Sequence, residues 1–174
     1  MKTILAIIGS ASENSTNLRL VEFLAAQTNN ELDWIIFNDL KNIPHFDPEL
    51  SANNPPKEVI AFRKQVEQAD GIIICTPEYV FSIPSGLKNA IEWCVSTTVF
   101  SDKPTGLITA SAQGEKGHEE LQLIMKTLMA KFTNETTLLI SGIKSKISTP
   151  GELTDPKTES ELERFVKSFS SLVE

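Results

Sequence analysis

Residues 76–93 combine the residue types best suited to hold a flat ligand, in the order TPEYVFSIPSGLKNAIEW. The segment follows an apolar run at 71–75 and leads into a helical pattern, which places its loop at the carboxyl edge of a parallel sheet. Two prolines stiffen this loop, and its aromatic side chains and backbone donors suit a planar heteroaromatic ring. Glu78 could donate a proton, orient a ligand or remain a solvated charge, and those three roles stay open.

A second candidate is the run GSASENSTNL at residues 9–18, between a predicted strand and a predicted helix. It lacks the glycines of a dinucleotide-binding fingerprint and the lysine of a Walker loop. Hydroxyls, amides and free N–H groups at a helix N-terminus can bind a phosphate without a cationic side chain. The alternative is a plain helix cap at Ser15 or Asn14, and the loop alone favours neither interpretation.

The third candidate is the run SAQGEKG at residues 111–117, whose glycines permit positive φ and close backbone approach. Taken alone, it is best interpreted as an ordinary loop. In a doubly wound sheet, however, the loops after strands one, three and four meet at one edge. The three runs together therefore predict one shared ligand site.

The elements that must position these loops alternate along the chain. Strands are predicted at 3–8, 33–37, 71–76, 104–110 and 136–141, and helices at 16–28, 56–69, 85–96, 117–132 and 158–172. The strands are apolar throughout, which indicates an α/β fold with helices on both faces of a parallel sheet. Right-handed crossovers favour a flavodoxin-like three-layer sandwich in strand order 2-1-3-4-5, although the periodicity alone allows other five-stranded open sheets. Residues 42–55 are interpreted as a surface loop, and Pro56 as the first residue of its helix.

Composition narrows the classes of function. The length of 174 residues predicts one domain, 1–174, and the formal net charge of −7 argues against a nucleic-acid-binding surface. Cys75 and Cys94 lie in apolar runs, so free thiols in a reducing, cytoplasmic compartment are expected. His45 and His118 are far apart in sequence, and no metal site is predicted. The apolar N-terminal run is interpreted as a buried strand, and no membrane insertion is expected.

The three runs resemble motifs of the NADPH-dependent FMN reductase family, flavodoxin-like proteins that include quinone, azo and chromate reductases. The form GSxRxxSxNxxL is matched at Gly9, Ser10, Ser15, Asn17 and Leu20. The form PEYNxSxPGxLKNAIDW is matched at Pro77, Glu78, Tyr79, Ser82, Pro84, Leu87, Lys88, Asn89, Ala90, Ile91 and Trp93. The family's third motif, a loop of serine and glycine residues, is matched at Ser111, Gly114 and Gly117, and the run IPHFD at 43–47 is similar to the family's linker after strand two.

Several positions depart from the family pattern. Ser12 stands where the family usually has an arginine near the FMN phosphate, and Val80 replaces an asparagine. Ser85, Glu92 and His118 replace glycine, aspartate and glycine. Losing an arginine removes a charge-assisted contact of about 1.5–3 kcal/mol unless another group replaces it. Hydroxyls and amides can still hold the phosphate, so the departures leave the resemblance intact.

The resemblance implies an FMN-dependent oxidoreductase that takes electrons from NADPH or NADH and reduces a small acceptor, such as a quinone, an azo or nitro compound, or free flavin. It places the FMN phosphate at Ser10, Ser15, Thr16, Asn17 and Leu18. It places the isoalloxazine ring against Pro77, Glu78, Tyr79 and Val80, with Ser111 and Gly114 on the other side. Hydride transfer through a flavin needs no side-chain acid or base, so no catalytic residue is assigned.

Two other functions remain possible from the sequence. A flavodoxin-like electron carrier would bind FMN and use its acidic charge to dock on a basic protein partner. A non-catalytic protein with a decayed flavin site would explain Ser12, Val80 and His118. The apolar run of Tyr79, Val80, Phe81 and Ile83 suggests a homodimer or homotetramer, and the alternative is that these side chains pack within their own domain.

Overall fold

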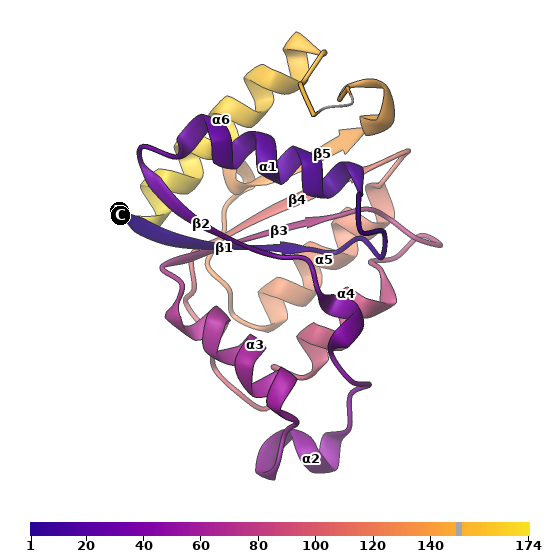
Figure 1. The fold of residues 1–174 in the computed structure, drawn as a ribbon, viewed down its shortest axis with the longest axis vertical. Helices are drawn as coiled ribbons and strands as arrows, with labels where there is room; N and C mark the ends of the chain where they lie inside the picture. The colour runs from indigo at the N-terminus through magenta and orange to yellow at the C-terminus, as the bar shows by residue number, and fades with distance from the viewer. Residues whose placement is uncertain (149–150) are drawn as a thin grey trace.

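The centre of the computed structural model, which describes residues 1–148 and 151–174, is a five-stranded sheet (Figure 1). Its strands are β1 (Lys2–Ile8), β2 (Leu32–Phe37), β3 (Gly71–Thr76), β4 (Thr105–Ser111) and β5 (Thr137–Ser141). All neighbouring strands are parallel, in the order β2-β1-β3-β4-β5. The predicted order is confirmed, and each strand begins and ends at, or one residue from, its predicted position.

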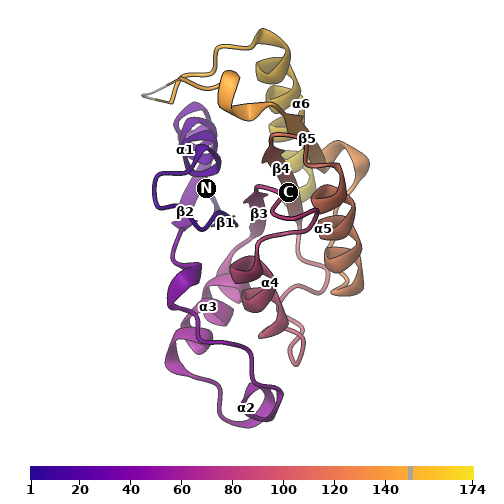
Figure 2. The ribbon, with the colours of Figure 1, turned by 90° about the vertical axis from the view of Figure 1, so that its right-hand side faces the viewer.

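Helices cover both faces of the sheet, which makes three layers (Figures 1 and 2). One face carries α1 (Thr16–Thr28) and α6 (Pro156–Val173), and the other carries α3 (Lys57–Gln68), α4 (Ser85–Glu92) and α5 (Glu115–Thr127). Successive residues of β1 alternate between the two cores: Leu5 packs on the α3 side and Ile4 on the α1 side, both fully buried. Burial on both faces explains why β1, from Ile4 onward, and β3 are almost continuously apolar.

The segment between β2 and α3 contains helix that the sequence analysis missed. A 3₁₀ turn spans Leu40–Asn42, and α2 spans Pro48–Asn53, so the prediction of a loop over 42–55 was wrong. Asp47 caps α2, because its side chain accepts a 2.8 Å hydrogen bond from the Glu49 N–H, and proline fits the first position of a helix. Pro56 is the residue before α3 rather than its first residue.

The second half of the long motif serves the fold. Asn89 and Trp93, in and just after α4, hold the linker that follows β2. Trp93 Nε1 donates to the Pro44 carbonyl at 2.7 Å, and Asn89 Nδ2 donates to the same oxygen at 2.9 Å. Asn89 Oδ1 accepts from the Phe46 N–H at 2.8 Å. These bonds explain why the motif and the IPHFD linker occur together in one sequence.

Candidate cofactor site

A cleft of about 440 Å³ opens where the carboxyl ends of the strands meet, the edge that faces the viewer in Figure 2. This volume lies within the range of roughly 300–1,000 Å³ that is usual for small-molecule sites. Four loops, those after β1, β3, β4 and β5, line the cleft. The predicted residues that line it are Ser10, Ser15, Thr16, Asn17, Pro77, Tyr79 and Ser111. The loops after β1, β3 and β4 therefore converge as the sequence predicted.

The loop after β1 ends in a capped helix. Ser15 is the N-cap of α1, and its Oγ accepts a 3.1 Å hydrogen bond from the Leu18 N–H. Thr16 and Asn17 are the first two residues of the helix, so their N–H groups have no acceptor within it. The structure thus contains the helix cap that the sequence offered as an alternative. A cap of this kind still leaves amide donors and the positive end of the helix dipole facing the cleft.

Asn17 uses its side chain to join α1 to the sheet. Only 3% of the residue is exposed, and its Nδ2 donates to the Ala110 carbonyl at 3.2 Å. Its Oδ1 accepts from the Cys75 thiol, with Sγ and Oδ1 3.4 Å apart. Both groups of the amide are therefore occupied within the protein, and the backbone N–H is what Asn17 can offer a ligand.

The loop after β3 makes a two-residue turn of unusual composition. Tyr79 and Ser82 exchange backbone hydrogen bonds of 2.9 and 3.1 Å. Between them, Val80 and Phe81 have φ of 53° and 58°. Two positive φ values are typical of a type I′ turn, which favours asparagine and glycine. An asparagine at position 80, as in the family motif, fits this backbone better than valine does.

Replacing Val80 by asparagine should raise the free energy of unfolding by about 1 kcal/mol, because a β-branched residue pays a steric penalty in the left-handed region. Val80 is 94% exposed, so the change sacrifices almost no buried apolar area. Urea unfolding would measure the effect. Val95→Asn is the matched control, since Val95 is 62% exposed and is not among the residues with positive φ. Equal effects of the two substitutions would contradict the strain argument.

Two carboxylates fasten this loop to α5. Glu78 Oε2 accepts from the Gly117 N–H at 2.8 Å, in the first turn of that helix. Glu120 accepts from Ser82 Oγ at 2.5 Å and from the Ile83 N–H at 3.0 Å. A Cβ at position 117 would lie 3.2 Å from the Glu78 side chain, so glycine allows this close approach. Glu78 therefore supports the loop from behind the cleft.

The loop after β4 turns into α5 at Gly114. Its φ of 99° favours glycine, and an added Cβ would lie 2.8 Å from Leu139 Cδ1. Gly114 shapes this loop but does not line the cleft. Three other predicted residues also do not line it: Leu18, Glu78 and Val80. Ser111, by contrast, lies on the cleft wall between Ala110 and Ala112.

His118 lies behind the same loop, with Nδ1 2.9 Å from Thr109 Oγ1. Burial lowers the pKa of His118 below its ordinary value. In the unfolded chain the imidazole of His118 binds a proton near pH 6.5, whereas in the folded protein it does so only at a lower pH. Above about pH 6.5 the free energy of unfolding is therefore at its full value, and it decreases as pH falls through the lowered pKa. Between about pH 7 and pH 5 the wild type should therefore lose more stability than His118→Asn, as urea midpoints at each pH would show. Parallel pH profiles for the two proteins would exclude this role for His118.

Neither thiol offers a nucleophile. Cys75 and Cys94 are free and buried, and burial raises the pKa of both, that of Cys94 to about 12. Within residues 1–148 and 151–174, no cluster of three or more His, Cys, Asp and Glu side chains could hold a metal ion. None of the helices that the structure describes combines the length and the apolar character needed to cross a bilayer.

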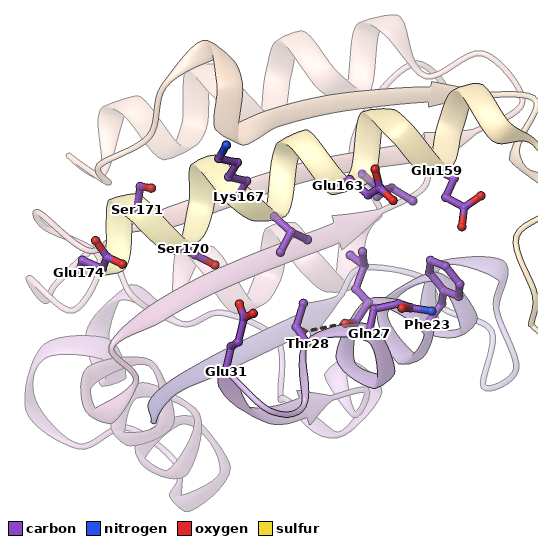
Figure 3. A pocket seen from close by; sticks show the side chains of 13 residues that line it. Phe23, Gln27, Thr28, Glu31, Glu159, Glu163, Lys167, Ser170, Ser171 and Glu174 are labelled. Carbon is purple, nitrogen blue, oxygen red and sulfur yellow. Dashed lines mark hydrogen bonds between the residues drawn. The ribbon is translucent and has the colours of Figure 1, made fainter.

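Another cavity, of about 490 Å³, lies between α1 and α6, away from the motif loops (Figure 3). Its walls carry the carboxylates of Glu31, Glu159, Glu163 and Glu174 beside the single ammonium of Lys167. Excess negative charge disfavours an anionic ligand. The cleft at the carboxyl edge is therefore the better candidate for a phosphate-bearing cofactor.

The fourth wall of the cleft was not predicted from the sequence. Ile143 and Lys144 line it, and they belong to the 3₁₀ turn Ile143–Ser145 that follows β5. A signal was present, because in a parallel sheet the loop after the fifth strand ends at the same edge as the others. Ser12 and Asn14 also line the cleft, and the motif match did not include them.

The sheet order, the three layers and the cleft at the carboxyl edge define a flavodoxin-like protein. The sequence model of the NADPH-dependent FMN reductase family matches residues 2–144, so the chain belongs to that family, as its motifs predicted.

Curated relatives agree with this family, and a solved structure shares the fold. The chain is 30% identical over 172 residues to the NADH:(hydroxy)cinnamate reductase subunit CrdA of Vibrio ruber, covering 95% of this chain and 84% of the relative. It is 27% identical over 177 residues to 2-hydroxy-1,4-benzoquinone reductase from Burkholderia sp, covering 98% and 95%. The solved structure of FerB, a flavoenzyme NAD(P)H:(acceptor) oxidoreductase from Paracoccus denitrificans, shares the fold with a TM-score of 0.80 and 24% identity, over 99% of this chain and 97% of that one.

Proposed function

We propose that this chain is an FMN-dependent NAD(P)H oxidoreductase that reduces a small acceptor, such as a quinone, an azo or nitro compound, or free flavin. One observation carries the proposal: the three loops with FMN reductase motifs converge on one cleft of about 440 Å³. Membership of the family and its quinone reductase relatives support it. Bound FMN would supply the redox chemistry, accepting a hydride from NADH or NADPH and giving electrons to the acceptor.

The donors at one end of the cleft suit a phosphate. Hydroxyls of Ser10, Ser12 and Thr16 line the wall beside the first turn of α1, where the backbone N–H groups of Thr16 and Asn17 are free of intrahelical acceptors. Neutral donors at a helix N-terminus stabilise a dianion through hydrogen bonds and the helix dipole. In this proposal Ser15 and Leu18 act on the phosphate indirectly, by closing the cap that fixes this turn.

The other end of the cleft suits a flat ring. Pro77, Tyr79 and Ser111 line the cleft, and the Tyr79 hydroxyl lies 3.3 Å from Ser10 Oγ. Backbone N–H groups of these loops would orient the bound ring and stabilise negative charge on its reduced form. Glu78, Val80 and Gly114 would hold the walls in place from behind. No described side chain is required as a proton donor in this arrangement.

We also propose that the chain is a single FMN-binding domain that works in the cytoplasm as a homodimer or homotetramer. Ile83 is buried in the chain's own core, whereas Phe81 is 71% exposed at the turn beside the cleft. An exposed apolar turn of this kind is suited to a subunit contact. Light scattering after gel filtration would test it, and a monomer at micromolar concentration would contradict this part of the proposal.

The visible spectrum of the purified protein, before and after FMN is added, tests the main proposal. A bound flavin band that NADH or NADPH bleaches under anaerobic conditions, and that a quinone restores, is the expected result. A flavin band that neither nucleotide bleaches would favour an electron carrier. Absence of flavin binding would favour a non-catalytic protein with a decayed site.

A further inference from the structure

Lys144 and Ser12 line the same cleft from two different loops. Both residues line the cleft, Ser12 from the loop after β1 and Lys144 from the turn after β5. That turn starts at Gly142, whose φ is 69° and whose N–H donates to the Ala112 carbonyl at 3.1 Å. The backbone therefore fixes where the lysine stem begins.

The segment that carries Lys144 lies beside the first turns of α1. Arg19, in the first part of that helix, donates from Nη1 to the Ser148 carbonyl at 3.4 Å. Figures 1 and 2 show the same neighbourhood, with the orange segment after β5 next to α1. Lys144 lines the same cleft as Thr16 and Asn17, at the helix N-terminus that offers free amide donors.

The charge on Lys144 is available for a ligand. Its side chain is exposed, and it forms no salt bridge with any residue that the structure describes. Nearby lysines differ: Lys41 pairs with Glu13, and Lys146 Nζ lies 3.9 Å from Asp155 Oδ2. Among the described residues that line the cleft, Lys144 is the one with a charged side chain.

We propose that Lys144 is a phosphate-binding residue for FMN and that it supplies the positive charge which Ser12 does not. This inference rests on the proposed function, because it assigns a residue to the cofactor of that function. An ammonium on a flexible stem binds phosphate as a point charge, and this one comes from a different loop than the hydroxyls. The phosphate would then have neutral donors from α1 on one side and a cation from the β5 turn on the other.

Paired titrations with FMN and riboflavin separate the phosphate from the ring. Quenching of flavin fluorescence gives Kd for both ligands with the wild-type apoprotein and with Lys144→Met. The variant should bind FMN about 10-fold to 100-fold more weakly, as expected for a lost charge-assisted hydrogen bond, and should bind riboflavin as the wild type does. The salt dependence of FMN binding should also become weaker, because a screened charge pair is gone.

Three further variants sharpen the test. Lys146→Met removes a neighbouring lysine that does not line the cleft, and it should leave both Kd values unchanged. Lys144→Arg should keep most of the affinity for FMN. Adding Ser12→Arg to Lys144→Met should restore FMN binding, because it returns the cation to the other wall. Thermal unfolding of the apoproteins should show equal stability for wild type and Lys144→Met.

The outcomes that overturn the assignment are distinct from failure of the proposed function. Equal weakening of FMN and riboflavin binding, or no change in either, refutes a phosphate contact at Lys144 while FMN binding itself stands. A wild-type protein that binds neither flavin refutes the proposed function, and the role of Lys144 with it.

Discussion

Replacing Asn17 by aspartate is expected to lower the free energy of unfolding by about 3 kcal/mol or more at neutral pH. The wild-type amide is buried and donates to the Ala110 carbonyl oxygen on β4. A carboxylate in its place would point negative charge at that oxygen with no proton to donate, and burial would further disfavour the charge. Urea unfolding of the apoprotein would measure the loss without any contribution from cofactor binding.

The same substitution should show a distinctive pH dependence. The folded state should hold the proton of the new carboxyl more tightly than the unfolded chain does, so its pKa should rise above about 3.9. A group with a raised folded pKa contributes stability below its unfolded pKa and loses it as pH rises through the folded value. The deficit relative to the wild type should therefore be smallest near about pH 4 and grow toward pH 8.

Asn14→Asp is the matched control for Asn17→Asp. Asn14 is exposed in the same loop, just before the Ser15 cap, so the control adds the same charge without burying it. An acidic residue near a helix N-terminus is neutral or slightly stabilising, by about 0.3–1 kcal/mol. If both variants lost similar stability, or if the Asn17→Asp deficit did not change with pH, the bonds of Asn17 to the sheet would not be important for folding.

Gly9→Ala is expected to cost about 3 kcal/mol of stability, at the upper end of the usual range for overpacking. Gly9 directly follows β1, and its N–H donates to the carbonyl of Cys75 in β3 at 2.8 Å. An added Cβ would lie 2.3 Å from Thr76 Oγ1 and 2.6 Å from Thr76 Cβ. Thr76 is fully buried, so the backbone of the loop must shift instead. Because Ser10 follows directly, FMN binding should weaken as well.

Gly86→Ala is the matched control for Gly9→Ala, because it makes the same substitution at a glycine that has space for a Cβ. Gly86 is in the first turn of α4, and an added Cβ would meet only Leu40 Cβ, at 3.7 Å. Replacing a helical glycine by alanine stabilises by about 0.5–1 kcal/mol where there is space. Urea unfolding and fluorescence titration with FMN should therefore separate the two variants. A Gly9→Ala protein as stable as Gly86→Ala would contradict the close contact with Thr76.

The architecture could be predicted from the sequence because each strand is recognised from its own short run of residues. Burial on both faces makes a parallel strand almost continuously apolar, so β1 and β3 could each be recognised from their own residues. Right-handed crossovers then limited the strand orders. Capping chemistry is equally local, yet the cap at Asp47 was overlooked, and α2 was interpreted as a loop.

The sequence by itself thus predicted the strand order, the family and the three loops that meet at the cleft. Only the tertiary structure decided what individual side chains contact. Asn17 matches a phosphate-loop motif, but its amide bonds to Ala110, 93 residues away, and Glu78 bonds to Gly117, 39 residues away. Lys144 belongs to no motif, and it reaches the cleft because β5 ends at the same edge. Periodicity reports which backbone element forms, whereas a side chain's partner depends on distances that exist only once the sheet is assembled.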